Sequence, residues 1–267
     1  MIHHWVDTKT NVSAVAVLRP EEGRCLIGRA VAAMPLVRER TQRGRMVIVG
    51  GTTTRHVVAS LLGEDPGRDT FAVGWIRDGL LGETPKESRG PGPFLFESGR
   101  VSRGWPGTLL EHFEAGDVYI KGANAIDPAG HVAVLMASST GGTIGAAMTI
   151  LMARGGELIV PISLGKAIPS VPAVCRVLGQ GRSVRVMGSP VGYMPIMAGA
   201  ATVITEVEAV TILSEGHVRA IPVAAGGVDD CEGALVMALE GLPQAVDQMM
   251  DLLESIRRES LLTNHPA

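Results

Sequence analysis

The sequence predicts an α/β fold built on a doubly wound, mostly parallel, Rossmann-like sheet with helices on both faces. Short apolar runs with the length of buried strands alternate with segments of helical spacing, which is typical of βαβ units. Only 19% of the 267 residues are charged and the mean hydropathy is +0.24, as expected for strands that are buried on both faces. The 34 glycines suit tight turns between strands and helices.

The N-terminal part, residues 1–44, is predicted to be a helical segment that packs on the core. Apolar residues recur at helical spacing over 24–41, in spite of Pro35. The remainder, 45–267, is predicted to be a single domain, because its length suits one large α/β unit.

In the first half of that domain, apolar runs mark strands, and glycine and proline mark their ends. A short buried strand at 45–50 is followed by a helix over 53–63 that ends at a glycine. The next predicted elements are a strand at 70–76, a hairpin at 94–104 and a short helix at 107–114. Between them, 77–93 is rich in Gly, Pro and charged residues, so it is predicted to be a long loop, either a linker or a lid over a site.

In the second half, the same criteria predict further strands and helices. The predicted strands are 117–123, 131–137, 156–163, 183–190 and 218–228. A helix is predicted at 143–154, and 231–259 is predicted to be two helices that are split near 241–243. Because strands alternate with helices, right-handed crossovers between parallel strands are expected.

Composition and charge argue against several classes of function. The formal net charge of −3 gives no basic surface for DNA or RNA, so no nucleic-acid partner is predicted. Residues 132–153 carry no charge over the length of a membrane span, but Ser, Thr and Gly at 138–143 interrupt them, so no membrane span is predicted. The start of the chain lacks a signal-peptide pattern, and Cys25, Cys175 and Cys231 lie far apart, which indicates reduced thiols in a cytoplasmic protein.

The first candidate site is the turn after the first strand of the domain. Ligands of open α/β sheets bind beyond the carboxyl ends of the strands. Gly50 and Gly51 let a ligand approach the backbone, and the helix that follows directs free N–H groups to the same place. Thr52, Thr53 and Thr54 add hydroxyl donors. The pattern predicts a phosphate or carboxylate site; the alternative is a helix cap without a ligand.

A second group of polar residues follows the strand at 117–123. Asn124 and Asp127 place an amide and a carboxylate in one glycine-bounded loop, and His131 comes shortly after. Asp127 precedes Pro128 and can equally be a turn residue. His131 begins an apolar strand and can equally be structural. If the protein is an enzyme, Asp127 is the candidate acid or base, with His131 assisting.

Two further elements complete the predicted site. Lys166 follows the strand at 156–163, where its ammonium group would counter an anion, unless it is a solvated loop lysine. The loop before the helix at 143–154 is a second candidate anion cradle. It consists of Ser138, Ser139, Thr140, Gly141, Gly142 and Thr143. The turn at 50–54 is neither a Walker motif nor a dinucleotide-binding glycine pattern, and no metal or cofactor is predicted.

These segments, taken in order, resemble a known superfamily. Residues 47–62 resemble the first strand, Gly-Thr-Thr-Thr turn and helix in the effector domains of DeoR-type sugar-responsive repressors, and 117–132 and 157–169 look like later segments of that domain. Residues 117–132 also resemble the Gly-Ala-Asp-Glu-x-Asp segment of ribose-5-phosphate isomerase A. All belong to the superfamily of glucosamine-6-phosphate deaminase, ribose-5-phosphate isomerase and CoA transferases, called NagB/RpiA/CoA transferase-like. The resemblance covers 45–170.

The chain departs from the catalytic patterns of these relatives. Where the isomerase has Asp-Glu-x-Asp, this chain has Asn, Ala, Ile and Asp at 124–127, so only Asp127 is retained. The glutamate that the isomerase uses as general base, near the start of the helix after its glycine-rich loop, has no counterpart. No segment resembles the nucleophile region of CoA transferases, and residues 1–44 do not resemble a DNA-binding winged helix.

Three functions remain open. The first is non-catalytic binding of a small anionic, phosphorylated, sugar-like metabolite at the glycine- and threonine-rich turns. The second is an isomerase-like or transferase-like enzyme in which Asp127 transfers a proton, His131 or Lys166 assists, and the loop at 77–93 closes over the substrate. The third is a regulatory or oligomerisation subunit. The low charge and the oligomers that relatives form predict a homo-oligomer.

Overall fold

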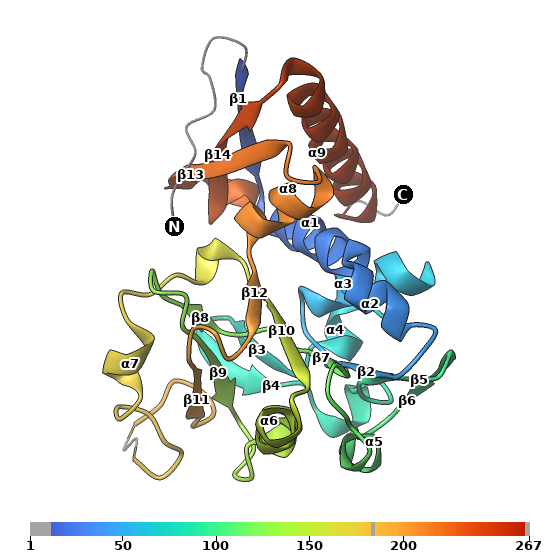
Figure 1. Cartoon of the computed structure of the whole chain (residues 1–267). Helices are drawn as coiled ribbons and strands as arrows, with labels where there is room; N and C mark the ends of the chain where they lie inside the picture. Colours follow the sequence, from blue (N-terminus) through green and yellow to red (C-terminus); the bar gives the residue numbers. More distant parts are fainter. Residues whose placement is uncertain (1–11, 183–184, 265–267) are drawn as a thin grey trace.

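The computed structural model describes residues 12–182 and 185–264 (Figure 1). Its elements, with η denoting a 3-10 helix, are β1 (Val12–Leu18), α1 (Pro20–Ala33), α2 (Pro35–Arg40), β2 (Arg45–Ile48), α3 (Thr54–Leu62), α4 (Arg68–Phe71), β3 (Gly74–Arg77), β4 (Leu80–Glu83), η1 (Lys86–Ser88), β5 (Phe94–Glu97), β6 (Arg100–Arg103), α5 (Gly107–Glu111), β7 (Val118–Ile120), β8 (Ala125–Ile126), β9 (Val132–Met136), α6 (Gly142–Arg154), β10 (Glu157–Pro161), η2 (Leu164–Lys166), α7 (Val171–Val174), β11 (Gly192–Ile196), β12 (Thr202–Ile204), α8 (Glu206–Leu213), β13 (Val218–Gly226), η3 (Asp229–Cys231), β14 (Ala234–Gly241) and α9 (Pro243–Asn264).

A six-stranded sheet with strand order β12-β10-β7-β2-β5-β6 forms the centre of the molecule. β12, β10, β7 and β2 are parallel neighbours, and β5 and β6 form an antiparallel hairpin beside β2. The predicted α/β class and mostly parallel sheet are therefore confirmed. The four parallel strands cross the sheet in their order along the chain, without the reversal of strand order that separates the halves of a Rossmann fold. The doubly wound arrangement stays a prediction.

The central strands separate two hydrophobic cores. Met46 and Ile48 of β2 lie in one core with residues of α1, α3, α8 and α9, whereas Val47 lies in the other with residues of α5 and α6. This division follows from the alternation of side chains along a strand. Val57 and Val58 attach α3 to the first core, which holds the start of that helix just beyond the end of β2.

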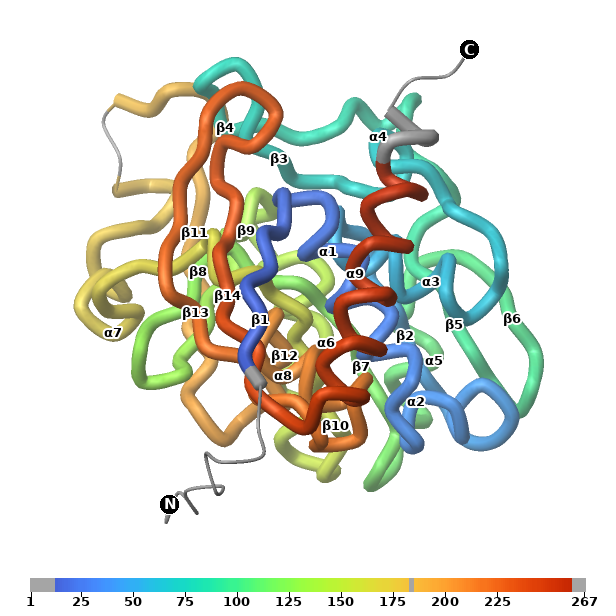
Figure 2. Tube along the Cα trace, turned by 90° about the horizontal axis from the view of Figure 1, so that it is seen from above, coloured from blue at the N-terminus to red at the C-terminus, as the bar shows by residue number. Residues whose placement is uncertain are grey.

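Three smaller sheets adjoin the central one. β1, β14 and β13 form an antiparallel sheet, and α9 packs along β1 and β14 (Figures 1 and 2). β11, β9 and β8 form another antiparallel sheet, and β3 pairs with β4 in a hairpin. On β1, Ala16 and Leu18 face the core, whereas Val15 and Val17 face outward.

The N-terminal prediction is wrong in part. Residues 1–11 lie outside the described residues, and β1 occupies 12–18, so 1–44 is not a purely helical segment. The helix predicted at 24–41 is two helices, α1 and α2, because Met34 is extended. The ring of the proline that begins α2 disfavours the helical conformation in the residue before it.

The C-terminal prediction is also wrong in part, because the first of the two helices predicted over 231–259 is a strand. β14 occupies 234–241, and a single helix, α9, begins at Pro243. The side chains of 236–241 alternate between buried and half-buried, as in a strand with one face on a core. Pairing with β1 on one side and β13 on the other stabilises this conformation.

Three predictions in the middle of the chain are wrong as well. The predicted strand at 70–76 is the short helix α4 followed by β3, which begins at Gly74. The predicted loop at 77–93 contains β4 and η1, because β4 pairs with β3. The strand predicted at 183–190 is absent from the part of that range that the structure describes, 185–190.

The remaining predicted elements are confirmed as β2, α3, the β5–β6 hairpin, α5, β7, α6 and β10. The strands predicted at 131–137 and 218–228 are β9 and β13, but both belong to antiparallel sheets and not to the central sheet. Within the described ranges, none of the helices combines the length and the apolar character that crossing a membrane requires. Cys25, Cys175 and Cys231 are free thiols.

Candidate functional site

A cavity of ≈ 140 Å³ lies at the carboxyl ends of β2 and β7. Its walls are the turn at 50–54, the segment 121–124, the β3–β4 hairpin, and residues of β9 and of the segment that precedes β11. The predicted site residues that line it are Gly50, Gly51, Thr52, Thr53, Thr54, Asn124 and Lys166. Three separate predicted segments therefore meet in one place, at the edge of the sheet where α/β folds bind ligands.

The turn at 50–54 has its shape because of close backbone packing. A Cβ atom on Gly50 would lie 2.0 Å from the carbonyl oxygen of Phe71, so only glycine fits there. The hydroxyl of Thr54 donates to the carbonyl of Val49 over 2.6 Å and holds the turn closed. Thr54 is therefore a structural residue of the turn, and its hydroxyl proton is already in use.

The start of α3 offers backbone donors to this cavity. The first N–H groups that donate to backbone carbonyls of the turn are those of Arg55, to Gly51, and His56, to Thr53. No acceptor for the N–H groups of 52–54 is found within the described parts of the chain. Free N–H groups and the partial positive charge at a helix N-terminus favour an anion.

Two lysines enter the cavity from adjacent parallel strands. Lys121 follows β7, and Lys166 lies in η2, which follows β10, so both leave the same edge of the sheet. Both side chains are half-buried. Nζ of Lys166 donates to the carbonyl of Ala123 over 2.7 Å. Sequence reasoning missed Lys121, although a lysine directly after a fully buried strand was a usable signal.

The environment lowers the pKa of both lysines. Burial, followed by the positive charge of Lys166, lowers the pKa of Lys121 to about 8. Burial, followed by the charge of Arg24, lowers the pKa of Lys166 to about 8, against an opposing effect of Glu206. Each amine therefore changes its charge close to neutral pH.

No acid balances these charges from the cavity wall. Of the described residues that line the cavity, Lys121 and Lys166 are the charged ones, and none is Asp, Glu, Arg or His. Asn124 adds a polar group: its Oδ1 accepts from the N–H of Leu135 over 3.0 Å, which leaves the Nδ2 amide to donate. The cavity thus has donors and positive charge, and an anion is the complementary guest.

The β3–β4 hairpin covers the cavity. Trp75 and Leu81 line it, and a Cβ atom on Gly82 would lie 2.2 Å from the ring of Trp75. The N–H of Leu81 donates to the carbonyl of Met187, and its carbonyl accepts from the N–H of Ser189. The segment 77–93, predicted to be a long loop and either a linker or a lid, therefore contributes a strand that pairs with β3 and hydrogen-bonds to residues 187 and 189.

Asp127 and His131 do not line the cavity. Asp127 is buried, and its carboxylate accepts from the N–H groups of Ala129, His131 and Val171 at 2.9–3.0 Å. Burial alone would raise the pKa of Asp127, but these backbone donors hold it below its ordinary value. Nδ1 of His131 accepts from the N–H of Ala198. Asp127 thus has the contacts of a turn-forming residue, and His131 binds the backbone of a segment that is distant in the sequence.

The glycine-rich loop at 138–143 also lies outside the cavity lining, which ends at Ala137 on this side. Two of its hydroxyls, those of Ser138 and Thr140, hydrogen-bond to each other over 3.0 Å. The carbonyl of Thr143 accepts from the hydroxyl of Tyr119 over 2.7 Å. The loop serves to start α6 and to fasten it to β7.

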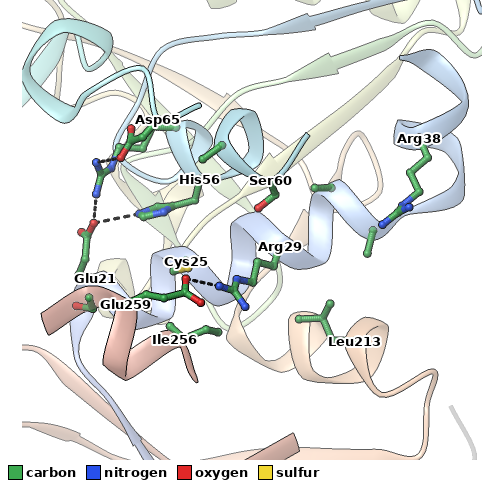
Figure 3. A pocket seen from close by; sticks show the side chains of 15 residues that line it. Glu21, Cys25, Arg29, Arg38, His56, Ser60, Asp65, Leu213, Ile256 and Glu259 are labelled. Carbon is green, nitrogen blue, oxygen red and sulfur yellow. Dashed lines mark hydrogen bonds and ion pairs between the residues drawn. The ribbon is translucent and has the colours of Figure 1, made fainter. Parts of the chain in front are cut away.

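A larger cavity of ≈ 550 Å³ lies between α1, α3 and α9 (Figure 3). Several of its charged groups are paired with one another: Glu21 accepts from Arg55 and His56, and Arg29 pairs with Glu259 (Figure 3). Burial alone would raise the pKa of Glu21, but His56 and the neighbouring arginines lower it. Acidic and basic side chains therefore both line this cavity, whereas the smaller one is lined by two lysines and no acid.

Within 12–182 and 185–264, no group of three or more His, Cys, Asp and Glu side chains is arranged to hold a metal ion. The small cavity encloses too little volume for a dinucleotide, because the sites of such cofactors measure several hundred Å³, about 300 or more. A small anion remains the guest that its walls suit.

Comparison of the chain with protein-family models, with curated proteins and with solved structures gives no match. The resemblance to the superfamily of sugar-phosphate isomerases and CoA transferases therefore stays a prediction.

Proposed function

We propose that the small cavity binds a small anionic metabolite through a carboxylate or phosphate group. The group would lie between the N–H donors at the start of α3 and the ammonium groups of Lys121 and Lys166. One observation carries the proposal: two lysines and no acid line the same cavity as the turn at 50–54. Charge-assisted hydrogen bonds of this kind are the strong ones in anion recognition.

The volume limits how much of a ligand is enclosed. A cavity of about 150 Å³ holds one benzene molecule, which has about six non-hydrogen atoms. At ≈ 140 Å³, this cavity encloses a ligand of that size or the anionic end of a larger one. A phosphorylated, sugar-like metabolite would therefore extend out of the cavity.

Titration calorimetry with sulfate and with lactate tests the proposal. Lys166→Met removes one ammonium group and is expected to weaken binding by about 10- to 100-fold, because a hydrogen bond to a charged group is worth about 1.5–3 kcal/mol. Lys86→Met is the matched control, since Lys86 is exposed in η1 and does not line the cavity. Equal affinities of the two variants would contradict the proposal.

The isomerase-like alternative has less support. Enolisation needs a base within hydrogen-bond reach of the transferred proton, and the carboxylate of Asp127 is engaged by backbone N–H groups outside the cavity lining. Turnover of a sugar phosphate that Asp127→Asn abolishes without loss of affinity would restore this alternative.

The proposed homo-oligomer rests on a different observation. A regulatory or oligomerisation subunit would be one function of such an assembly. Val15 and Val17 on the outer face of β1 are 64% and 42% exposed, and a second copy of the chain would cover them. Light scattering of Val15→Lys tests this, with Val101→Lys on β6, which is 44% exposed in the native chain, as the control. We also propose a doubly wound sheet, membership of the superfamily of sugar-phosphate isomerases and CoA transferases, and a cytoplasmic location, as the sequence predicts.

A further inference from the structure

Lys121 is the less constrained of the two amines in the small cavity. Nζ of Lys166 donates to the carbonyl of Ala123, whereas no hydrogen bond or ion pair of the Lys121 side chain is found within the described parts of the chain. No carboxylate lines the cavity to neutralise either amine. Lys121 therefore presents an uncommitted amine to an anion that the cavity holds.

The charge state of this amine suits attack on a carbonyl group. A lysine acts as a nucleophile only when it is neutral, and burial beside another cation favours the neutral form. Burial and the charge of Lys166 lower the pKa of Lys121 to about 8. About a tenth of such an amine is neutral at about pH 7, against less than about a thousandth of an amine with the ordinary lysine pKa of about 10.4.

The size of the cavity selects the partner of this amine. An enclosed ligand has about six non-hydrogen atoms, and the walls favour an anion at ≈ 140 Å³. A three-carbon 2-oxo acid has this size. It carries a carboxylate for the N–H donors of the turn at 50–54 and for Lys166, and a ketone beside that carboxylate for a second amine.

We infer that Lys121 condenses with the carbonyl group of a small 2-oxo acid to form an imine. The inference rests on the proposed function, because the carboxylate must be held while the carbonyl reacts. The nitrogen lone pair forms a bond to the carbonyl carbon, and the carbonyl oxygen leaves as water with the two hydrogens that the neutral amine loses. The step needs no oxidant or reductant.

Reductive trapping tests the imine. The full chain is incubated with pyruvate and cyanoborohydride at about pH 7, and each of its four lysines is followed by peptide mass spectrometry. We expect the reduced adduct on Lys121 to form at least about tenfold faster than on the exposed Lys86, because much more of its amine is neutral. Lactate carries the same charge without the ketone, so it should compete with pyruvate for Lys121.

Variants and a second carbonyl compound sharpen the experiment. Lys121→Arg keeps the positive charge, so it should lose the adduct and still bind lactate, whereas Lys86→Met should behave as the native chain. The competition by lactate uses the native chain alone and does not depend on the folding of a variant. Dihydroxyacetone phosphate is larger, so it should react more slowly than pyruvate; a faster reaction would overturn the 2-oxo acid assignment.

Four outcomes would contradict the inference, and they differ in whether the proposed function survives. Equal labelling of Lys121 and Lys86 would show unspecific amine chemistry, and labelling of Lys166 alone would overturn the assignment to Lys121. The absence of any adduct, with lactate or sulfate still bound, would overturn the imine and leave the proposed function standing. The absence of both adduct and anion binding would remove both proposals.

Discussion

The sharpest prediction concerns the pH dependence of anion binding. Both lysines in the small cavity have pKa values of about 8. Raising the pH from about 7 to about 9 therefore lowers the protonated fraction of each amine about tenfold. If the anion needs both ammonium groups, its affinity falls by about 100-fold over this range, or about 2.7 kcal/mol of binding free energy.

Sulfate is the suitable ligand for this measurement, because its own charge does not change between neutral and alkaline pH. Titration calorimetry at a series of pH values gives the slope of the affinity against pH. The lysines interact, so the slope reports the titration of the pair and not of either residue alone. An affinity for sulfate that stays constant over this range would refute the assignment of the two amines to the site.

Single substitutions separate the contributions of the two lysines. Lys121→Met leaves one titrating amine, so the change in affinity across this range should shrink from about 100-fold to about tenfold. Lys166→Met should reduce the change to less than about tenfold, because the charge of Lys166 lowers the pKa of Lys121 and its removal moves the remaining titration to higher pH. A midpoint that does not move would contradict the proximity of the two amines.

Three further predictions concern stability. Gly50→Ala forces a Cβ atom against the carbonyl of Phe71, so urea denaturation should show a loss of about 1–3 kcal/mol or more, whereas Gly74→Ala, which meets no atom within 4 Å, should be tolerated. Asp127→Asn weakens three bonds from backbone N–H groups and should cost about 1–3 kcal/mol without changing the affinity for sulfate; a loss of affinity alone would place Asp127 in the site. Because the folded-state pKa of Lys121 is lowered to about 8, the unfolded chain binds more protons between that value and the ordinary lysine value of about 10.4, so stability rises with pH across this window. Lys121→Met should therefore raise the urea midpoint at about pH 7 and raise it less at about pH 10; an equal increase at both values would contradict the lowered pKa.

The parts of the fold that were predictable depend on local signals. β2, the turn after it and α3 form one continuous pattern of apolar strand, paired glycines and a helix ended by Gly63, which adopts the left-handed conformation. β14 lacks such a signal, because Ala, Leu, Met and Glu are good helix formers. Its strand conformation comes from β1 and β13, whose residues lie elsewhere in the chain. The propensities of neighbouring residues therefore do not predict a strand at 234–241, because they do not include pairing with distant parts of the chain.

The candidate site was predictable in part, namely for the residues that directly follow strands of the parallel sheet. Gly50, Thr52 and Lys166 follow strands of a parallel sheet, and the geometry of such a sheet brings them together. Asp127 also lies close to a strand in sequence, but β8 and β9 turn away into a separate antiparallel sheet. That change of sheet places the carboxylate against the backbone N–H groups of Ala129, His131 and Val171. The Asp-Pro pair at 127–128 is compatible with this turn role, but it does not distinguish it from a role in the site.

The pairing of β1 with β14 has a consequence for the order in which the molecule is completed during synthesis. Leu18 of β1 lies opposite Leu235 of β14, more than two hundred positions later in the chain. β13 pairs with β14 as well, so neither outer strand of this sheet can pair before β14, which is synthesised last of the three. A nascent chain can assemble β2, β7 and β10 earlier, but residues 12–18 find their partner only when the ribosome has released 234–241.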